Sequence, residues 1–351
     1  MQNKRAPMPR PPRQMAWWKV LLIDLGLLIV SLLVFALFDH VLPQKQQAVP
    51  MVQATLRPTP QPTPVAAAES QNEVASEATA APAVETAVVS DPGDFSAKFA
   101  DKFTGGEVIQ TENTYQSGNI NLTLTRYETM LDDNAEVYFV ADVYVRNIEC
   151  LRTLFADDNY GKSINEAMVS MSQRCGALVA TNSDYYSFRT TGTVIRNGVM
   201  YRGGVSPDMQ VAILFRDGTM KAYMNESELD MNQVMADGAW QGFCFGPSLL
   251  DENGNLWPSY ESVNHNPRTI LGMVEPGHYL LIVIDGRQGS YSEGMTYREC
   301  AELCQQLGCK FAFNLDGGKT SQMTWMGEVI NQPYAGGRDT SDIIYIAEPG
   351  A

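Results

Sequence analysis

Side chains able to do chemistry gather at four places where apolar runs of the sequence end. The four clusters are Asn182, Asp184, Tyr185 and Tyr186; His265, Asn266, Arg268 and Thr269; Asp285, Arg287, Gln288 and Ser292; and Asn314, Asp316, Lys319, Thr320 and Ser321. Two of them have the form of an apolar strand that ends in Asp-Gly, IVIDGR and FAFNLDGG. A carboxylate at the end of a buried strand is partly desolvated, so its pKa can be tuned for acid–base work. Gly317 and Gly318, which follow Asp316, let a ligand or another backbone segment approach closely.

The segment FNLDGGKTSQM (313–323) contains GGKTS, which looks like the end of a phosphate-binding loop. Such a loop requires the pattern G-x-x-x-x-G-K-[ST]. Aligning Gly318, Lys319 and Thr320 with the end of that pattern places Phe313 where the first glycine is needed. Asp316 would also put a negative charge where phosphates must lie. The segment is therefore predicted not to bind a nucleotide.

The N-terminus has the pattern of a membrane anchor. Residues 1–19 carry basic side chains and no acid, and the apolar run 20–38 contains Asp24 as its one charge. At about 1.5 Å per residue this run gives a helix of roughly 28 Å, close to the hydrocarbon thickness of a bilayer. A cleaved signal peptide is the alternative, but no small-residue cleavage site follows. We expect a single-pass protein of the cell membrane whose basic tail stays in the cytoplasm and whose remainder lies outside it.

The next segment, 39–93, is expected to be a disordered stalk. It is rich in Pro, Ala, Thr and Gln, and TPQPTP lies near its centre. Such a composition cannot bury enough apolar surface to fold and favours extended conformations.

Charge and cysteine content narrow the classes of partner. The net charge of −15 argues against nucleic acid as a partner, and because the first 38 residues are basic the remainder is more acidic still. An anionic substrate would therefore need a local cationic site. Six cysteines outside the cytoplasm suggest disulfides, with bridges from Cys150, Cys175, Cys244 and Cys309 left open. No zinc-ligand spacing is present.

The globular part is predicted to be α+β, with a strand-rich mixed sheet core and interleaved helices. Apolar or alternating runs bounded by turn residues predict strands at 120–128, 136–145, 177–182, 192–201 and 209–223. The last two runs contain hairpin signals, at Asn197-Gly198 and Asp217-Gly218. A helix is predicted at 295–308, where Thr296 and Glu299 form a capping box, and a second at 226–238. Cys300 and Cys304 fall on the apolar face of the first helix, so we expect them to be buried as small hydrophobes. The outer region is divided into an N-terminal strand-rich part, 94–169, and a second part, 170–351.

The ordered motifs NSDYY, PRTILG, IVIDGR, NLDGGKTSQM and INQP resemble those of the phosphodiester glycosidase family. That family includes the lysosomal enzyme that removes N-acetylglucosamine from a phosphodiester on mannose, and bacterial exopolysaccharide-associated proteins. The resemblance spans about residues 170–347. It implies Asp316, Asp285 and Arg268 as catalytic residues, and Asn182, Asp184, Tyr185, Thr269, Arg287, Asn314, Gly317, Gly318, Lys319 and Ser321 as substrate-binding residues. The chain departs from the family pattern at Ser183, Asp184, Lys319, Thr320 and Gln322, and Lys319 would narrow the pocket or add a cation.

The resemblance implies a hydrolase that cleaves a sugar-1-phosphodiester bond in a surface glycan or cell-wall polymer. Arg268 and Arg287 would clamp the phosphate, with Asp316 as the key carboxylate and Asp285 as the second. No cofactor is required, and a divalent cation such as Ca²⁺ or Mg²⁺ is left open without a ligand motif to support it. The alternative is a non-catalytic, membrane-tethered module that binds glycan or cell wall on the same scaffold.

Overall fold

The computed structural model describes residues 49–50, 91–131, 134–204, 209–223, 228–257 and 264–350. The basic tail, the membrane helix predicted at 20–38 and most of the predicted stalk lie outside these residues. In the part of the chain that the structure describes, no helix combines the length and the apolar character needed to cross a membrane.

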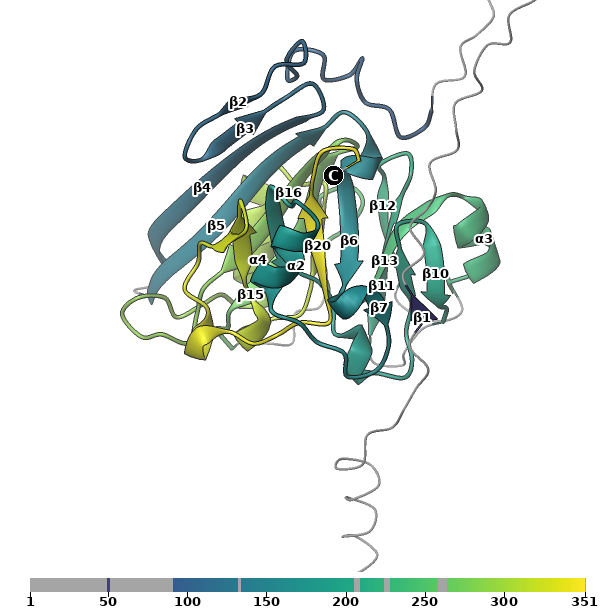
Figure 1. Ribbon diagram of the computed structural model, residues 1–351. Helices are drawn as coiled ribbons and strands as arrows, with labels where there is room; N and C mark the ends of the chain where they lie inside the picture. Colours follow the sequence, from purple (N-terminus) through teal and green to yellow (C-terminus); the bar gives the residue numbers. More distant parts are fainter. Residues whose placement is uncertain are drawn as a thin grey trace, which may run out of the picture. The chain divides into compact units, whose positions relative to one another are not determined.

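An eight-stranded sheet forms one side of the core (Figure 1). Its strands, in spatial order, are β14 (Ser248–Leu250), β17 (Phe311–Asn314), β15 (Arg268–Glu275), β16 (His278–Ile284), β5 (Asn134–Val145), β4 (Ile120–Leu131), β3 (Thr114–Gln116) and β2 (Ile109–Gln110). The two longest strands, β4 and β5, run side by side, with β3 and β2 beyond them (Figure 1). The pairing of β5 with β16 places part of the region 94–169 in the same sheet as the second part of the globular region.

Two five-stranded sheets complete the strand framework. The first contains β19 (Glu328–Val329), β18 (Met323–Trp325), β8 (Val179–Asn182), β20 (Asp342–Ile346) and β6 (Leu151–Phe155). The second contains β10 (Val199–Arg202), β9 (Val194–Arg196), β13 (Ala239–Phe245), β11 (Gln210–Phe215) and β12 (Met220–Tyr223). The short strands β1 (Val49–Pro50) and β7 (Asn159–Tyr160) pair with each other.

The strand-rich α+β core with few helices is confirmed. Every strand pairing among the described residues is antiparallel, so strand direction is more uniform than the mixed sheets expected from the sequence. The hairpin predicted at Asn197-Gly198 joins β9 to β10, and both residues have positive φ, of 51° and 79°. The hairpin predicted at Asp217-Gly218 joins β11 to β12.

Three α-helices lie among the described residues: α2 (Met168–Arg174), α3 (Met231–Ala236) and α4 (Tyr297–Gln306). Short 3₁₀ turns occur at η2 (Ile148–Cys150), η3 (Ala156–Asp158), η4 (Tyr186–Phe188), η6 (Gly318–Thr320) and η7 (Tyr334–Gly336). The capping box of Thr296 and Glu299 begins α4 as predicted. Helix α3 is shorter than the predicted segment 226–238, and Asp230 caps its N-terminus.

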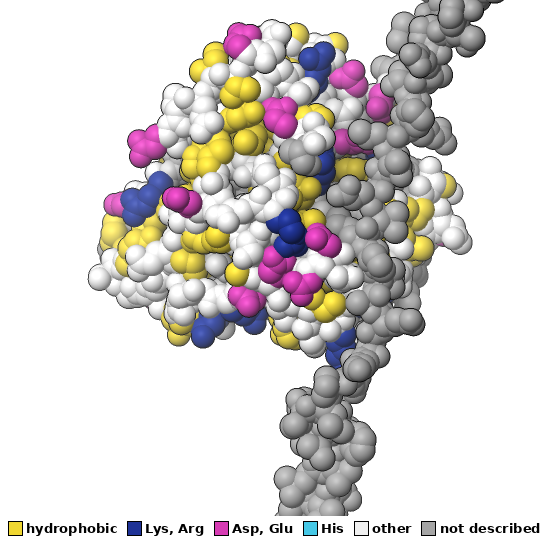
Figure 2. Space-filling view, viewed as in Figure 1, with side chains coloured by type: hydrophobic (Ala, Val, Ile, Leu, Met, Phe, Trp, Pro, Cys, Tyr) yellow, Lys and Arg dark blue, Asp and Glu magenta, His cyan; other side chains and the backbone are white. Residues whose placement is uncertain are grey.

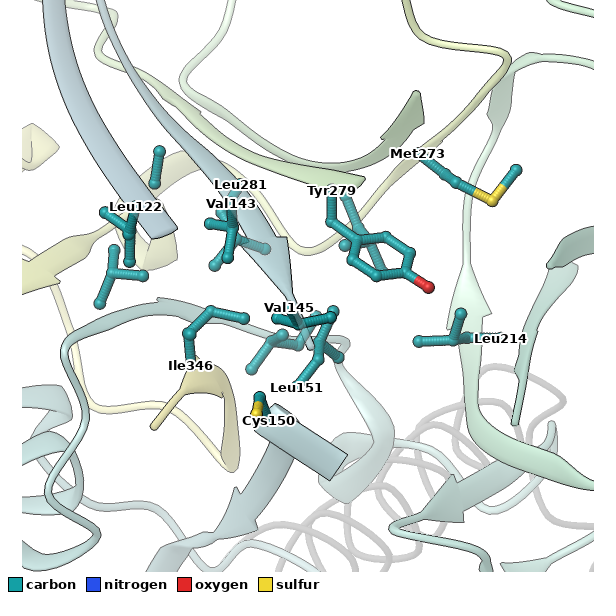
Figure 3. Packing of buried hydrophobic residues seen from close by; sticks show 14 of the residues in the cluster. Leu122, Val143, Val145, Cys150, Leu151, Leu214, Met273, Tyr279, Leu281 and Ile346 are labelled. Carbon is teal, nitrogen blue, oxygen red and sulfur yellow. The ribbon is translucent and has the colours of Figure 1, made fainter. Parts of the chain in front are cut away.

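The largest hydrophobic cluster lies between the sheets and draws on all three of them. Figure 3 shows Leu122, Val143 and Leu281 from the eight-stranded sheet close to Leu151 and Ile346 from a five-stranded sheet. A second cluster lies under α4 on the other face of the eight-stranded sheet and includes the buried residues Cys300, Cys304 and Cys309. Both faces of the central strands are therefore covered, which explains why β16 is buried along its whole length.

The expectation of disulfides is wrong for the described chain, in which all six cysteines are buried and none forms a disulfide. Cys150 packs beside Val145 and Leu151 in the largest cluster (Figure 3), while Cys175 and Cys244 belong to two other clusters. These three thiols lie apart because each one packs in a different hydrophobic cluster. Cys300 and Cys304 are fully buried on α4, as predicted.

Acidic and basic side chains are interspersed with neutral and hydrophobic ones over the face drawn in Figure 2. The chain as a whole carries a net charge of −15. A local concentration of arginine and lysine therefore stands out against the acidic background.

Candidate active site

The ends of three strands from two sheets meet around Asn182. Its side chain lies at the end of β8 and is completely buried. Its Nδ2 donates to the carbonyl of Asp316 at 2.7 Å, and its Oδ1 accepts from Thr269 Oγ1 on β15 at 2.8 Å. The loop that follows β17 is therefore fixed to both sheets by one amide side chain. Asn182 and Thr269 hold this loop in position and do not line the pocket that it borders.

A pocket of about 350 Å³ opens above these strand ends. Its lining residues are Phe245, Asn266, Pro267, Arg268, Arg287, Tyr297, Asn314, Asp316, Gly317, Gly318, Lys319 and Arg338. Four of them are cationic, and Asp316 is the one carboxylate among them. Such a cavity has the size of a small-molecule site and the charge to hold an anion.

Asp316 lies at the wall of this pocket, and only 8% of its surface is exposed. Its Oδ1 accepts from the backbone N–H of Gly317 at 3.0 Å. Its Oδ2 accepts from Thr320 Oγ1 at 2.6 Å and from Arg338 Nη2 at 2.7 Å. Burial raises the pKa of Asp316 above its ordinary value, while Thr320 and Arg338 act in the opposite direction. The carboxylate is thus held in one orientation by three donors.

The two glycines after Asp316 fit the tight turn for different reasons. A Cβ at Gly317 would lie 2.8 Å from the carbonyl oxygen of Pro267. Gly318 has a φ of +70°, and a Cβ there would lie 3.3 Å from Arg287 Nη1. The first glycine is needed for close approach and the second for its backbone conformation. Lys319 then projects as an exposed side chain at the pocket edge.

Arg268 begins β15 and is nearly buried against the pocket floor. Its Nε donates to the carbonyl of Met295 at 2.9 Å, and its Nη2 donates to the carbonyl of Asn264 at 3.1 Å. The guanidinium carbon lies 3.9 Å from the centre of the Tyr297 ring. Two backbone carbonyls and one ring therefore fix this cation before any ligand arrives.

Arg287 approaches the same pocket from the loop after β16. Its Nε and Nη2 both donate to Asn266 Oδ1, at 2.8 and 2.6 Å. Its guanidinium lies 5.5 Å from the Tyr334 ring centre. Arg268 and Arg287 are thus oriented by neighbouring residues of one segment, 264–266.

Glu136, on β5, holds the segment 292–295, which also contacts Arg268. It is 1% exposed, and its Oε2 accepts from Gly294 N at 3.0 Å and from Ser292 Oγ at 3.4 Å. The next residue, Met295, provides the carbonyl that binds Arg268. Burial raises the pKa of Glu136 to about 7, with a smaller upward contribution from Glu299.

Asp285 does not line the pocket, although the family resemblance implied a catalytic role for it. Its Oδ1 accepts from Asn331 Nδ2 at 2.7 Å, and its Oδ2 accepts from Tyr291 Oη and from Gln332 N, both at 2.9 Å. Burial raises the pKa of Asp285, and these donors act against that rise. The structure therefore places Asp285 as an anchor for the 331–332 segment.

Asp184 also lies away from the pocket, in a buried ion pair. Its Oδ2 is 3.0 Å from Arg196 Nη2, and the same nitrogen lies 2.7 Å from Asp342 Oδ2. All three side chains are fully buried. Burial raises the pKa of Asp342 to about 7, with Arg196 opposing the rise. A triad of this kind fixes the start of the 183–190 loop, because removing one partner leaves a buried charge unpaired.

The remaining predicted residues divide between the pocket and its support. Asn314 lines the pocket, and its Nδ2 donates to the Gly246 carbonyl at 2.8 Å. Its buried Oδ1 has no hydrogen-bond partner among the described residues. Ser321 is buried behind the turn, where its carbonyl accepts from Asn331. Tyr185 lies next to the pocket because it contacts Arg338, which lines it. The Arg338 guanidinium is 5.3 Å from the centre of the Tyr185 ring.

Arg338 is the main functional candidate that the sequence patterns missed. It lies between the INQP motif and β20, and its Nε also donates to Thr320 Oγ1 at 2.8 Å. Tyr297, Asn266 and Phe245 line the pocket as well and had not been assigned to it. The signal for Arg338 was the preceding Gly336-Gly337 pair, both with positive φ, which marks a tight loop just before a buried strand.

No group of three or more His, Cys, Asp or Glu side chains suited to a metal ion occurs in the described ranges of the chain.

Comparison with known proteins places this site in a family. The profile of the phosphodiester glycosidase family matches residues 175–347. A SPbeta prophage-derived uncharacterized protein of Bacillus subtilis (strain 168), YomE, is 32% identical over 185 residues, which is 49% of this chain. The chain spans 28% of that relative's length.

One solved structure supports the fold, and a second gives a weaker match. The catalytic domain of zebrafish N-acetylglucosamine-1-phosphodiester alpha-N-acetylglucosaminidase, auto-inhibited by its pro-peptide, matches with a TM-score of 0.53 and 18% identity, over 69% of this chain and 88% of that one. A hypothetical protein from Synechocystis matches with a TM-score of 0.44 and 14% identity, over 69% of this chain and 64% of that one. At these identities the likeness concerns the fold alone.

Proposed function

Because residues 175–347 belong to the phosphodiester glycosidase family, we propose that this protein hydrolyses a sugar-1-phosphodiester bond in a surface glycan or cell-wall polymer. The observation that carries the proposal is the pocket that places Asp316 among four cations, Arg268, Arg287, Lys319 and Arg338. A glycosyl phosphodiester has one negative charge and an anomeric carbon that becomes positive as the bond breaks. The pocket offers groups of the matching sign for both.

Arg268 and Arg287 bind the phosphodiester anion. Each has nitrogens held by backbone carbonyls or by Asn266, so the orientation of its guanidinium is set before the substrate binds. Preorganised donors cost little reorganisation when charge develops on the leaving phosphate. Lys319, which is exposed at the pocket edge, adds a third cation.

Asp316 acts on the anomeric carbon. Its carboxylate stabilises the positive charge that develops there and takes a proton from the attacking water. A new bond forms between the water oxygen and the anomeric carbon as the bond from that carbon to the phosphate oxygen breaks. The electron pair of the broken bond leaves with the phosphate monoester. Arg338 and Thr320 keep the Asp316 oxygens in place throughout.

The leaving group needs little help from an acid. A phosphate monoester is a stable anion, and Arg268 and Arg287 stabilise the charge that it gains. The position of Asp285 outside the pocket is consistent with a reaction that uses one carboxylate at the anomeric carbon.

We also propose that the reaction takes place outside the cytoplasm, with the chain held at the membrane by the helix predicted at 20–38 and spaced from it by the 39–93 stalk. The basic residues of the first 19 positions and the apolar run after them support this arrangement. A protease added to intact cells should digest the globular part and leave a short N-terminal fragment in the membrane. Full protection in intact cells, with digestion after lysis, would reverse the proposed orientation.

The activity is tested with sugar-1-phosphodiesters of a simple alcohol, with N-acetylglucosamine and glucose as the sugars. The wild-type chain should release free sugar from at least one of them. Asp316→Asn should lower kcat by about 10²-fold or more. Arg268→Ala should lower kcat/KM by about 10- to 100-fold, the effect of losing a hydrogen bond to a charged group.

Matched controls separate catalysis from folding. Asp339→Asn removes an exposed carboxylate beside Arg338, and Arg298→Gln removes an exposed arginine on α4. Both controls should retain wild-type rates. Near-normal turnover by Asp316→Asn and Arg268→Ala would remove this site assignment. Tight binding of a glycan without any release of sugar would favour the non-catalytic binding module.

A further inference from the structure

A row of rings and arginines continues from the pocket onto the loop after β8. We call it the Arg189 strip, and it consists of Tyr185, Phe188, Arg189, Phe245 and Arg338. Tyr185 and Phe188 stack with their ring centres 4.4 Å apart and their planes 13° from parallel. The Phe188 side chain is 44% exposed, so the outer end of the strip faces solvent.

The strip is continuous with the pocket wall. Phe245 and Arg338 line the pocket itself. The Arg189 guanidinium lies 5.4 Å from the Phe245 ring centre and 5.6 Å from the Tyr185 ring centre. Arg338 lies 5.3 Å from the same Tyr185 ring. A ligand that leaves the pocket past Phe245 therefore meets Arg189 next.

Arg189 is a half-buried arginine beside the pocket wall. Its neighbour Arg338 forms an ion pair with Asp316. The Arg189 side chain forms none with any described carboxylate and packs against the faces of two rings. Rings hold a guanidinium in a defined orientation without neutralising it, so its N–H groups stay available to an anion.

Arg189 adds a further cation beside the four that line the pocket. Because the chain carries a net charge of −15, an anionic ligand depends on such local groups of cations. Arg189 packs against Phe245, which lines the pocket with the four cations. Positive charge therefore continues from the pocket onto the neighbouring surface.

We propose that the Arg189 strip is a second anion subsite, which binds the next phosphodiester of a polymeric substrate while the first lies in the pocket. The inference rests on the proposed glycosidase function and adds that the substrate carries repeated phosphodiesters. Arg189 binds the second phosphate, and the exposed ring of Phe188 packs against the sugar or polyol between the two phosphates. Planar guanidinium groups suit phosphate because they can donate two parallel hydrogen bonds.

The test compares a substrate that has one phosphodiester with an oligomer that has three. Both carry the same terminal sugar-1-phosphodiester, and the oligomer continues through glycerol phosphate units. Arg189→Gln in the full chain should raise KM for the oligomer roughly tenfold, the effect of about 1.4 kcal/mol. The KM for the single phosphodiester should stay within about twofold, and kcat should be unchanged on both. Arg298→Gln, with the same change of charge at an exposed site on α4, should affect neither substrate.

Binding is measured as well, so that the inference can fail separately from the proposed activity. A glycerol phosphate trimer should bind the wild-type chain roughly tenfold more tightly than it binds Arg189→Gln, whether or not sugar is released. An oligogalacturonate trimer provides equal charge on carboxylates. Equal affinity of both proteins for the glycerol phosphate trimer would overturn the inference. So would equal losses for the two trimers, because the subsite would then recognise charge and not phosphate. Absence of sugar release by the wild-type chain would count against the proposed function alone.

Discussion

Glu136 makes the stability of the segment 292–295 behind the pocket depend on pH. Glu136→Gln should remove this dependence. Burial raises the pKa of Glu136 from 4.5 to about 7, and the negative charges of Glu299 and Glu293 add to the rise. Between these two values the folded protein binds more protons at this site than the unfolded chain does. The free energy of unfolding therefore falls as pH rises from about 4.5 to about 7, and this contribution levels off above that. A rise of this size corresponds to at most about 3 kcal/mol.

Glutamine has nearly the shape of a protonated glutamate. Its side-chain oxygen can accept from Gly294 N and Ser292 Oγ, as Glu136 does. At low pH the Glu136→Gln variant should therefore match the wild-type protein in stability. Above about pH 7 it should be more stable by up to about 3 kcal/mol, because no buried negative charge has to form.

Urea denaturation of both proteins at several pH values from about 4.5 to 8 measures the difference. Asp342, whose pKa is also raised to about 7, titrates in both proteins, so its effect cancels when the two curves are subtracted. Glu128→Gln, which changes an exposed carboxylate on the neighbouring strand β4, is the matched control and should leave the curve unchanged. Parallel curves for wild type and Glu136→Gln across the whole range would refute the reasoning.

Three further changes test the geometry around Asp316. Arg338→Gln should raise the pKa of Asp316, because a cation that lowers it is lost, and the acidic limb of the pH–rate profile should move to higher pH; an unmoved limb would contradict the role of Arg338. Gly317→Ala should lower the free energy of unfolding by about 1–3 kcal/mol, since its Cβ would meet the Pro267 carbonyl at 2.8 Å, and unfolding in urea measures the loss. Asn331→Ala should cost about 1–3 kcal/mol by leaving an Asp285 oxygen without its donor, and an unchanged urea midpoint would show that Asp285 does not depend on this anchor.

Local sequence patterns were sufficient for the elements that carry the site. The capping box at Thr296, the hairpin signals and the apolar run before Asp316 each depend on residues close together in the chain, and each is found as predicted. The turn at Gly317 and Gly318 was also foreseeable, because glycine pairs mark close approach or positive φ.

The roles of the carboxylates could not be assigned in the same way. Asp184, Asp285 and Asp316 all follow buried strands, so the three look alike in the sequence. Their differences come from distant partners: Arg196 for Asp184, Asn331 for Asp285, and the open pocket for Asp316. A position at the end of a buried strand predicts that a carboxylate is partly buried. Which residue then bonds to that carboxylate depends on how the sheets pack together.

The cysteines illustrate the same limit. Six thiols predicted to lie outside the cytoplasm favoured disulfides on composition, and the helical spacing of Cys300 and Cys304 correctly indicated burial. Pairing depends on which core each thiol enters, and Cys150, Cys175 and Cys244 enter three different ones. The cysteine content bears on the compartment in which the protein resides, whereas the distance between two thiols decides whether a disulfide can form.

The site also depends on residues that precede the family match. Strand β5 pairs with β16 along seven residues, from His278 with Tyr144 to Ile284 with Tyr138, and it carries Glu136. Without β5, one edge of β16 would be unpaired, and the two clusters that it separates would lose Val143 and Val140. The Gly294–Met295 segment would also lose its anchor, and with it the carbonyl that orients Arg268. Arg268, which we propose to bind phosphate, is thus held in place through a strand that the family profile does not include.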